Sequence, residues 1–301
     1  MSPTLDTLRD RRYRRSSSNE TRVFDQFEKE VEMSNNLVAI VTGGGTGIGA
    51  ATTKTLRTQG WDVVICGRRL DPLEAIARET GAIPIVADAS SANDLGQLID
   101  RTLDRFGALN GLVLNAGIVR AGPVGSLSDE DWDDMLRTNL TGPFRLARAA
   151  LPHLLKSRGA IVGVSSIAAL RATGDIAGYN ATKAGLNMLM QSIAVDYGPQ
   201  GVRANAVCPG WTRTEMADME MREYGATLGL DADGVFSRAT SFVPARRPAS
   251  AAEIAEAIAW LLCDKSSYVN AAVLPVDGGM IAGDPGYLAL DLRVTFNLNV
   301  S

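Results

Sequence analysis

Histidine is almost absent from this chain of 301 residues, in which His153 is the only one. A site with two or three histidine ligands is therefore excluded, no metal site is expected, and a Ser-His-Asp or Cys-His mechanism would depend on His153 alone. Three cysteines are too few for a disulfide framework, and no two are spaced as CxxC, so we expect a reducing compartment, the cytoplasm. If the protein is an enzyme, another residue type must transfer its protons.

Long apolar runs and an excess of positive charge are also missing. No apolar run approaches the roughly 18 residues that indicate a membrane-spanning helix, so no span is expected. The formal net charge is −4, whereas a nucleic-acid-binding domain usually presents a basic face, so no nucleic-acid partner is expected. With 46% hydrophobic residues the chain can still form a full globular core.

The two ends of the chain differ in composition from the part between them. Residues 1–36 combine an arginine-rich stretch with three consecutive serines and several acidic residues. The acidic residues argue against a mitochondrial presequence, so we expect a mobile N-terminal tail, with a targeting or interaction arm as the alternative. Residues 284–301 form a C-terminal extension, which could be an added edge strand or an interface arm.

Between residues 37 and 283, short apolar runs alternate with helical patterns. The runs that we expect to form strands are at residues 37–42, 62–66, 83–87, 109–114, 160–164, 203–207 and 272–276. The expected helices are at residues 47–59, 71–80, 92–106, 129–157, 178–198 and 250–263. Several strands are apolar almost throughout, as in a parallel sheet buried on both faces. The pattern predicts an α/β fold with a doubly wound parallel sheet (a Rossmann fold) in a single domain, residues 37–283.

A glycine-rich turn follows the first predicted strand and precedes a predicted helix. Its sequence is Thr42-Gly43-Gly44-Gly45-Thr46-Gly47-Ile48-Gly49. Glycines let the backbone turn sharply and approach a pyrophosphate, which then lies on the N–H groups at the positive end of the helix dipole. Such a turn alone is weak evidence, but its position in an α/β domain predicts a dinucleotide site.

The end of the second predicted strand indicates which dinucleotide is bound. An acidic residue there would bind the ribose 2′-hydroxyl of NAD(H), whereas an arginine accommodates the 2′-phosphate of NADP(H). Here the strand is followed by Gly67-Arg68-Arg69, with no acidic residue at the turn. Because planar guanidinium groups bind phosphate well, Arg68 and Arg69 favour NADP(H) over NAD(H), with a solvated basic turn as the alternative interpretation.

A tyrosine and a lysine four residues apart lie near the start of the predicted helix 178–198. Tyr179 and Lys183 share one face of that helix, so the ammonium can approach the phenol. A nearby cation lowers a tyrosine pKa from about 10 toward neutral pH, which would make Tyr179 a usable general acid/base. Ser165 and Ser166 follow the strand 160–164, at the edge where ligands bind in open α/β sheets.

Together these features resemble the classical short-chain dehydrogenase/reductase (SDR) family over residues 37–283. The family's TGxxxGIG motif corresponds to the turn at residues 42–49. Its catalytic residues correspond to Asn139, Ser166, Tyr179 and Lys183. Its other cofactor-binding positions correspond to Asp88, Asn115, Ala116, Gly117, Pro209, Gly210 and Thr214. The chain departs from the family pattern at Leu114, Gly163 and Ala271, where Asn, Asn and Gly are common.

The resemblance implies hydride transfer between a nicotinamide and a ketone or secondary alcohol. Tyr179 would exchange the proton of the reacting oxygen, and Ser166 would hydrogen-bond that oxygen. Lys183 would lower the pKa of Tyr179 and bind the nicotinamide ribose, while Asn139 would support a water-linked proton relay. An NAD-preferring alcohol dehydrogenase of the same family and a non-catalytic dinucleotide-binding scaffold are the alternatives.

The same resemblance implies a homodimer or homotetramer, joined through the helices at residues 129–157 and 178–198. The substrate would be bounded by the loop after Gly117 and by residues 211–249, a segment without a long helix or strand pattern that we expect to act as a lid. The methionines and phenylalanines of this lid could either pack it down or line an apolar pocket. With Arg120 and Arg213 nearby, fatty acyl, steroid-like, terpenoid and sugar-derived ketones are all possible substrates.

Overall fold

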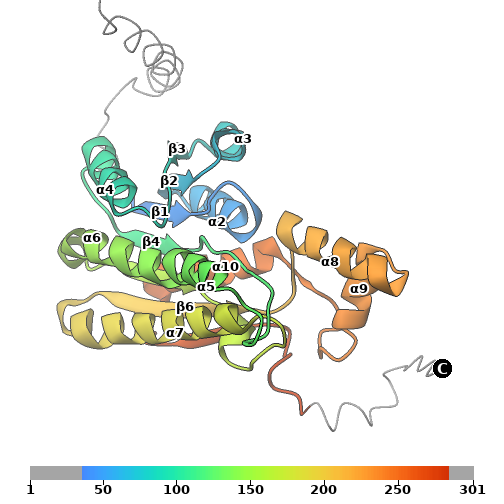
Figure 1. Cartoon of the computed structure of the whole chain (residues 1–301). Helices are drawn as coiled ribbons and strands as arrows, with labels where there is room; N and C mark the ends of the chain where they lie inside the picture. The colour runs from blue at the N-terminus through green and yellow to red at the C-terminus, as the bar shows by residue number, and fades with distance from the viewer. Residues whose placement is uncertain (1–35, 285–301) are drawn as a thin grey trace, which may run out of the picture. The chain divides into compact units, whose positions relative to one another are not determined.

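Seven parallel strands form the central sheet of the structure, a computed structural model that describes residues 36–284 (Figure 1). Apart from Asn36 and Asp284, the predicted N-terminal tail and C-terminal extension lie outside the described residues. In sheet order the strands are β3 (Ile83–Val86), β2 (Asp62–Gly67), β1 (Val38–Thr42), β4 (Gly111–Leu114), β5 (Ala160–Val164), β6 (Arg203–Pro209) and β9 (Val273–Val276). The predicted doubly wound α/β fold is confirmed.

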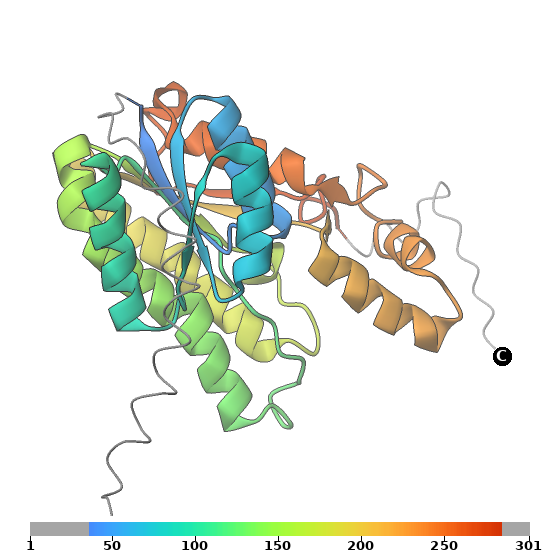
Figure 2. The same cartoon turned by 90° about the horizontal axis from the view of Figure 1, so that it is seen from above.

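Helices cover both faces of this sheet (Figure 2). Successive residues of a strand point to opposite faces, so Ala39 and Val41 pack into one core while Ile40 packs into the other. The first core is completed by α2 (Gly47–Thr58), α3 (Leu70–Thr80) and α10 (Ala251–Leu262). The second is completed by α4 (Ala92–Phe106), α6 (Gly142–Ser157) and α7 (Ala177–Tyr197). Burial on both faces explains why the strands are apolar throughout.

The strand order places a crevice at the carboxyl end of β1. The chain passes from β1 to β2 on one side and, after β3, to β4 on the other side. At such a switch point the two connections diverge, and ligands of open α/β sheets bind in the opening between them. The loops that follow β1, β2 and β4 are therefore the first place to look for a site.

The predicted helix at residues 129–157 consists of three consecutive helical elements. These are α5 (Asp129–Leu136), a π-helical turn (Arg137–Thr141) and α6. Pro143 has no amide hydrogen to donate to the carbonyl four residues earlier, so the regular ladder is interrupted there. The N–H of Gly142 donates instead to the carbonyl of Arg137, five residues back. The helix expected at residues 129–157 is therefore present, with a π-helical turn inside it.

Two helices occupy residues 211–249, in which the sequence pattern predicted no long element. They are α8 (Glu215–Leu228) and α9 (Ala232–Ala239), and Figure 2 shows them to one side of the sheet in orange. The expectation was wrong because these helices bury few apolar side chains, chiefly Met221, Val235 and Phe236, and their periodicity is therefore weak. The methionines and phenylalanines divide between the two expected roles, because Met221 and Phe236 pack between the helices while Met216 lines the pocket described below.

The ends of α8 and α9 carry the signals that could have revealed them. Thr214 and Asp231 each accept a hydrogen bond from a backbone N–H in the first turn, as helix-capping residues do. Gly229 ends α8 with a left-handed backbone, at φ 65°. Two short strands, β7 (Thr212–Arg213) and β8 (Ala249–Ser250), pair in parallel and connect the two ends of the segment.

The structure can be compared with two further expectations, that the chain has no membrane-spanning helix and that its cysteines form no disulfide framework. Within residues 36–284, no helix is both long enough and apolar enough to cross a membrane. Cys66, Cys208 and Cys263 are all free thiols. Burial raises the pKa of Cys66 to about 12, so this thiol stays protonated at neutral pH.

Candidate active site

A pocket of about 1170 Å³ lies at the carboxyl ends of the central strands. Its walls come from the loops that follow β1, β2, β4, β5 and β6, and from α7 and α8. Most of the predicted site residues line it, namely Gly43, Thr46, Gly47, Ile48, Arg68, Arg69, Asp88, Asn115, Ala116, Gly117, Ser166, Tyr179, Lys183, Pro209, Gly210 and Thr214. Thr42, Gly49 and Asn139 do not line it, but each contacts residues that do.

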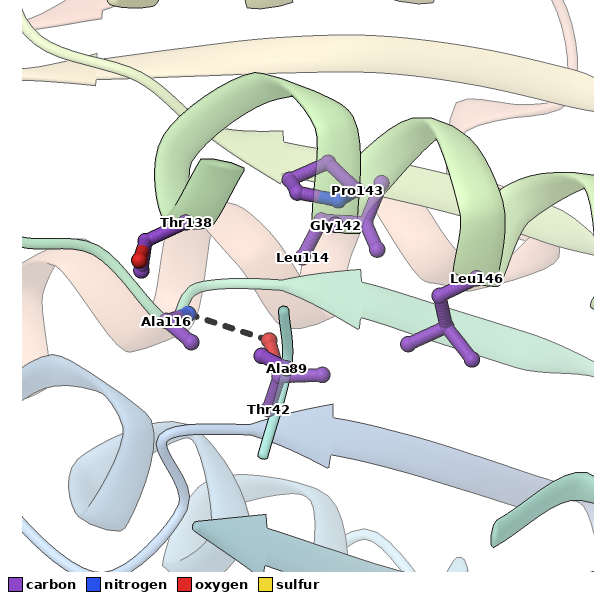
Figure 3. Close-up of a pocket in the computed structure, with 8 residues that line it drawn as sticks. All are labelled: Thr42, Ala89, Leu114, Ala116, Thr138, Gly142, Pro143 and Leu146. Carbon is purple, nitrogen blue, oxygen red and sulfur yellow. Dashed lines mark hydrogen bonds between the residues drawn. The ribbon is translucent and has the colours of Figure 1, made fainter. Parts of the chain in front are cut away.

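Thr42 fastens the end of β1 to the loop after β4 (Figure 3). Its hydroxyl accepts hydrogen bonds from the N–H groups of Asn115, at 2.9 Å, and Ala116, at 3.0 Å, and donates to the carbonyl of Val113. The side-chain amide of Asn115 donates to the carbonyl of Thr42 at 2.8 Å in return. The cavity in Figure 3 has a volume of about 10 Å³, room for one water at most, so Thr42 supports the main pocket and faces no ligand site of its own.

The turn after β1 presents backbone to the pocket. Gly43 and Gly47 have φ values of 65° and 54°, in the left-handed region that favours glycine. A Cβ on Gly49 would overlap the carbonyl oxygen of Gly43. Thr46 makes no side-chain cap to α2, and the first turn of α2 contains no acidic residue. The N–H groups at this helix end are thus left for an anion, which fits the pyrophosphate of a dinucleotide.

The end of β2 presents two guanidinium groups at the same pocket. Arg68 and Arg69 line the pocket, are exposed, and form no ion pair with any residue between 36 and 284. The acidic residue of β2, Asp62, is at the opposite end of the strand and pairs with Arg57 at 2.7 Å. Both arginines are therefore available to a phosphate.

Tyr179 and Lys183 meet Ser166 where β5 ends. The ammonium of Lys183 lies 5.5 Å from the centre of the Tyr179 ring and donates to the carbonyl of Val164 at 2.8 Å. Ser165, the neighbour of Ser166, donates its hydroxyl to the carbonyl of Lys183 at 3.0 Å. Tyr179 hydrogen-bonds with Ser166. The structure therefore brings the predicted serine, tyrosine and lysine into one group.

Burial controls the ionisation of this group. It raises the pKa of Tyr179 to about 12; the hydrogen bond with Ser166 acts in the opposite direction, and the negative charge of Glu220 adds to the rise. Burial lowers the pKa of Lys183 to about 8. The expected lowering of the Tyr179 pKa by Lys183 is not seen: burial sets the direction, and the lowering effect comes from Ser166. The phenol holds its proton at neutral pH and can act as an acid.

Asn139 braces the pocket wall from the π-helical turn. Its side-chain oxygen accepts from the N–H of Ile118, and its nitrogen donates to the carbonyl of Ile118, both at 2.8 Å. The same nitrogen contacts the hydroxyl of Thr182 at 3.2 Å. A Cβ on Gly117 would lie 3.1 Å from the Lys183 ammonium and 3.3 Å from the Asn139 oxygen, so a larger residue there would displace these two groups.

Helix α8 contributes pocket residues that the sequence pattern did not identify. Its first turn gives Glu215, Met216 and Ala217 to the pocket lining, and its later turns give Glu220, Glu223, Tyr224 and Thr227. Met216, Glu220, Glu223 and Thr227 are three or four residues apart, so these four share one face of the helix. This spacing could have identified these residues as neighbours, but only if the segment had first been predicted to be helical.

The two arginines expected beside the substrate do not line the pocket. Arg120 pairs with Asp131 and Asp134 of α5. Arg213 pairs with Asp218 of α8 and with Asp233 of α9. Both cations are therefore held in ion pairs, although the residues on either side of each arginine do line the pocket.

Fold and site together define a Rossmann-fold oxidoreductase. A family model described as enoyl-(acyl carrier protein) reductase matches residues 43–281. The chain belongs to the short-chain dehydrogenase/reductase family, whose members bind a nicotinamide dinucleotide. Its relatives are named dehydrogenases and reductases of alcohols and ketones, so this chain is an enzyme of the same kind.

Three of its relatives show the extent of the similarity. Protein MoaE of Klebsiella aerogenes is 41% identical over 254 residues, which cover 84% of this chain and 98% of that protein. Levodione reductase of Leifsonia aquatica is 33% identical over 258 residues, or 81% of this chain and 94% of that enzyme. The crystal structure of actinorhodin polyketide ketoreductase with NADPH has a TM-score of 0.78 and 32% identity, covering 82% of this chain and 97% of that one.

Proposed function

We propose that this chain is an NADP(H)-dependent oxidoreductase that interconverts a ketone and a secondary alcohol, with Tyr179 as the general acid/base. The observation that carries the proposal is the group formed by Ser166, Tyr179 and Lys183 in a pocket that also contains the glycine turn. The nicotinamide dinucleotide, when bound, supplies or accepts the hydride. The chain's own residues must then bind the reacting oxygen and move its proton.

Each residue of the group has a distinct part in this proton transfer. Ser166 donates a hydrogen bond to the substrate oxygen, where negative charge develops as a ketone is reduced. Tyr179, protonated because it is buried, gives its proton to that oxygen. Lys183 stabilises the phenolate that results, since its ammonium lies beside the ring. Because Tyr179 starts out protonated, we propose reduction as the favoured direction at neutral pH.

Asn139 acts as a positioning residue in this proposal. Its amide holds the backbone of Ile118 and touches Thr182, and so keeps the loop after β4 in place beside α7. The water-linked proton relay implied by the family resemblance remains part of the proposal for Asn139.

The end of β2 supports NADP(H) as the preferred dinucleotide. Arg68 and Arg69 bring to the pocket two guanidinium groups without an ion pair in the described part of the chain, and guanidinium groups match the charge and the geometry of a 2′-phosphate. The ketoreductase solved with NADPH is a relative over 82% of this chain. An NAD-preferring enzyme is the alternative, and the ratio of NADPH to NADH efficiency distinguishes the two.

Tyr179→Phe tests the proposed chemistry. The variant should lose turnover by about 10²–10⁴-fold, the usual contribution of a positioned acid/base, whereas the dissociation constant for NADPH should change by less than about threefold. Turnover is followed by nicotinamide absorbance on a panel of ketones with each cofactor. Tyr197→Phe, at the far end of α7 and outside the pocket, is the control. Full activity of Tyr179→Phe would contradict the acid/base role.

We also propose that the enzyme is a cytoplasmic homodimer or homotetramer. On α6 and α7, Phe144 is 45% exposed, Met188 61% and Val195 72%. Large apolar side chains on the outer faces of two neighbouring helices are suited to contact with a second copy. Light scattering on the eluting protein measures the oligomeric state. The free cysteines support a reducing compartment.

A further inference from the structure

The wall that α8 gives to the pocket is polar and carries negative charge. Glu220 and Glu223 line the pocket one turn apart, followed by Tyr224 and Thr227 on the same helix face. Glu220 is partly buried, and its charge is felt at Tyr179, whose pKa it helps to raise. Its own pKa is raised by burial and by the neighbouring Glu223. The carboxylate of Glu220 therefore acts on the part of the pocket where the proposed chemistry takes place.

No positive group of the described chain compensates this charge. Glu220 forms no hydrogen bond and no ion pair with any residue from 36 to 284. Arg68 and Arg69 belong to the loop after β2, and the ammonium of Lys183 is committed to the carbonyl of Val164. Arg120 is paired on α5.

Other pocket residues provide an apolar surface. Ile118 and Val119 come from the loop after β4, Ile176 from the residue before α7, and Trp211 from the residues before β7. A carbon skeleton can lie against these side chains while a polar substituent contacts α8. The pocket thus combines an apolar surface with a carboxylate that forms no hydrogen bond or ion pair within residues 36–284.

Resting on the oxidoreductase function proposed above, we propose that Glu220 is a specificity-determining residue that selects ketones or alcohols bearing an ammonium group. Glu223 adds to the negative charge that the ammonium meets. In a pocket partly shielded from water, the ammonium gains a charge-assisted hydrogen bond to Glu220. A carboxylate or phosphate at the same place is repelled, so anionic ketones are poor substrates.

Two aryl ketones that differ only in their charged substituent test this selection. The probes are 4-acetylbenzylammonium and 4-acetylbenzoate, each titrated into the full chain saturated with NADP⁺, so that no turnover occurs during the measurement. We expect the cation to bind at least about tenfold more tightly than the anion, as one partly screened charge contact allows. In Glu220→Gln the ratio should fall to within about threefold, and added salt should reduce the wild-type ratio in the same direction.

Glu130→Gln is the matched control, since it removes one exposed carboxylate from α5, outside the pocket. It should keep the wild-type ratio. Unaltered NADP⁺ binding shows that Glu220→Gln is folded. Equal binding of the two probes, no binding of the cation, or an unchanged ratio in Glu220→Gln overturns the assignment. Turnover of the neutral 4-methylacetophenone by the wild type is measured separately: turnover without charge preference rejects only the role of Glu220, whereas loss of turnover for every ketone rejects the proposed oxidoreductase.

Discussion

Replacing Lys183 by methionine should stabilise the fold while it removes activity. Lys183 is only 4% exposed, and burial lowers its pKa from 10.5 to about 8. The folded protein therefore binds this proton less strongly than the unfolded chain does. At about 1.4 kcal/mol per pKa unit, keeping the ammonium in the fold costs about 3 kcal/mol at pH 7.

A smaller loss opposes this gain. The Lys183 ammonium donates to the carbonyl of Val164 at 2.8 Å, and methionine leaves that carbonyl without its donor. An unsatisfied buried acceptor costs about 1 kcal/mol or somewhat more. Lys183→Met should therefore raise the free energy of unfolding by about 2 kcal/mol at pH 7.

The pH dependence gives this prediction a defined sign. The cost of the buried ammonium is fully present well below pH 8 and disappears as pH rises from about 8 to 10.5, because the unfolded chain alone still binds the proton in that window. The stability of the wild type relative to Lys183→Met should thus increase across this window. Urea denaturation from pH 6 to 10.5 measures it, with the exposed Lys156→Met as control. A variant less stable than the wild type at pH 7, with a difference that does not vary with pH, refutes the reasoning.

Three further predictions concern the cofactor site and the lid. Arg68→Ser with Arg69→Ser should weaken NADPH binding at least about tenfold and leave NADH binding nearly unchanged, as fluorescence titration would show; equal losses would contradict the 2′-phosphate assignment. Gly49→Ala should abolish binding of either dinucleotide and lower the melting temperature, because the added methyl group overlaps the carbonyl of Gly43. The control is Gly96→Ala, whose methyl group enters open space on α4; it should be neutral or stabilise the fold by about 0.5–1 kcal/mol. Arg213→Ala should speed proteolysis within residues 215–239 without changing the melting temperature of the core. The reason is that Arg213 forms ion pairs with both α8 and α9, and its guanidinium lies 4.4 Å from the Phe236 ring centre. Arg222→Ala, at a residue without an ion pair in the described chain, is the control.

Much of the pocket could be predicted because its parts are local. The glycine turn, the arginines after β2, and the pair Tyr179 and Lys183 are each contained in a few consecutive residues. In a parallel sheet the loops that follow the strands meet at one edge, so fold and motifs together imply a common site. Helix α8 was not predicted because it buries little apolar surface, and Glu220 was therefore not recognised as a pocket residue.

Two departures from the family pattern have their explanation only in three dimensions. A Cβ on Gly163 would lie 3.0 Å from the Met190 side chain, so the asparagine that is common there would require Met190 to shift. Ala271 has a φ of 59°, a left-handed conformation in which the family's glycine is less strained. Neither contact can be read from neighbours in the sequence.

The sequence by itself determined the fold, the family resemblance and the residues proposed for proton transfer, because periodicity and motif spacing are properties of short segments. Only the tertiary structure decided the ionisation of Tyr179 and Lys183 and the charge of the substrate pocket. Desolvation and electrostatic interaction depend on everything that surrounds a group in space, and the surroundings of Tyr179 come from β5 and α8 as well as from its own helix. Burial accordingly keeps the Tyr179 phenol protonated at neutral pH, whereas the spacing of Tyr179 and Lys183 in the sequence had predicted a lowered pKa.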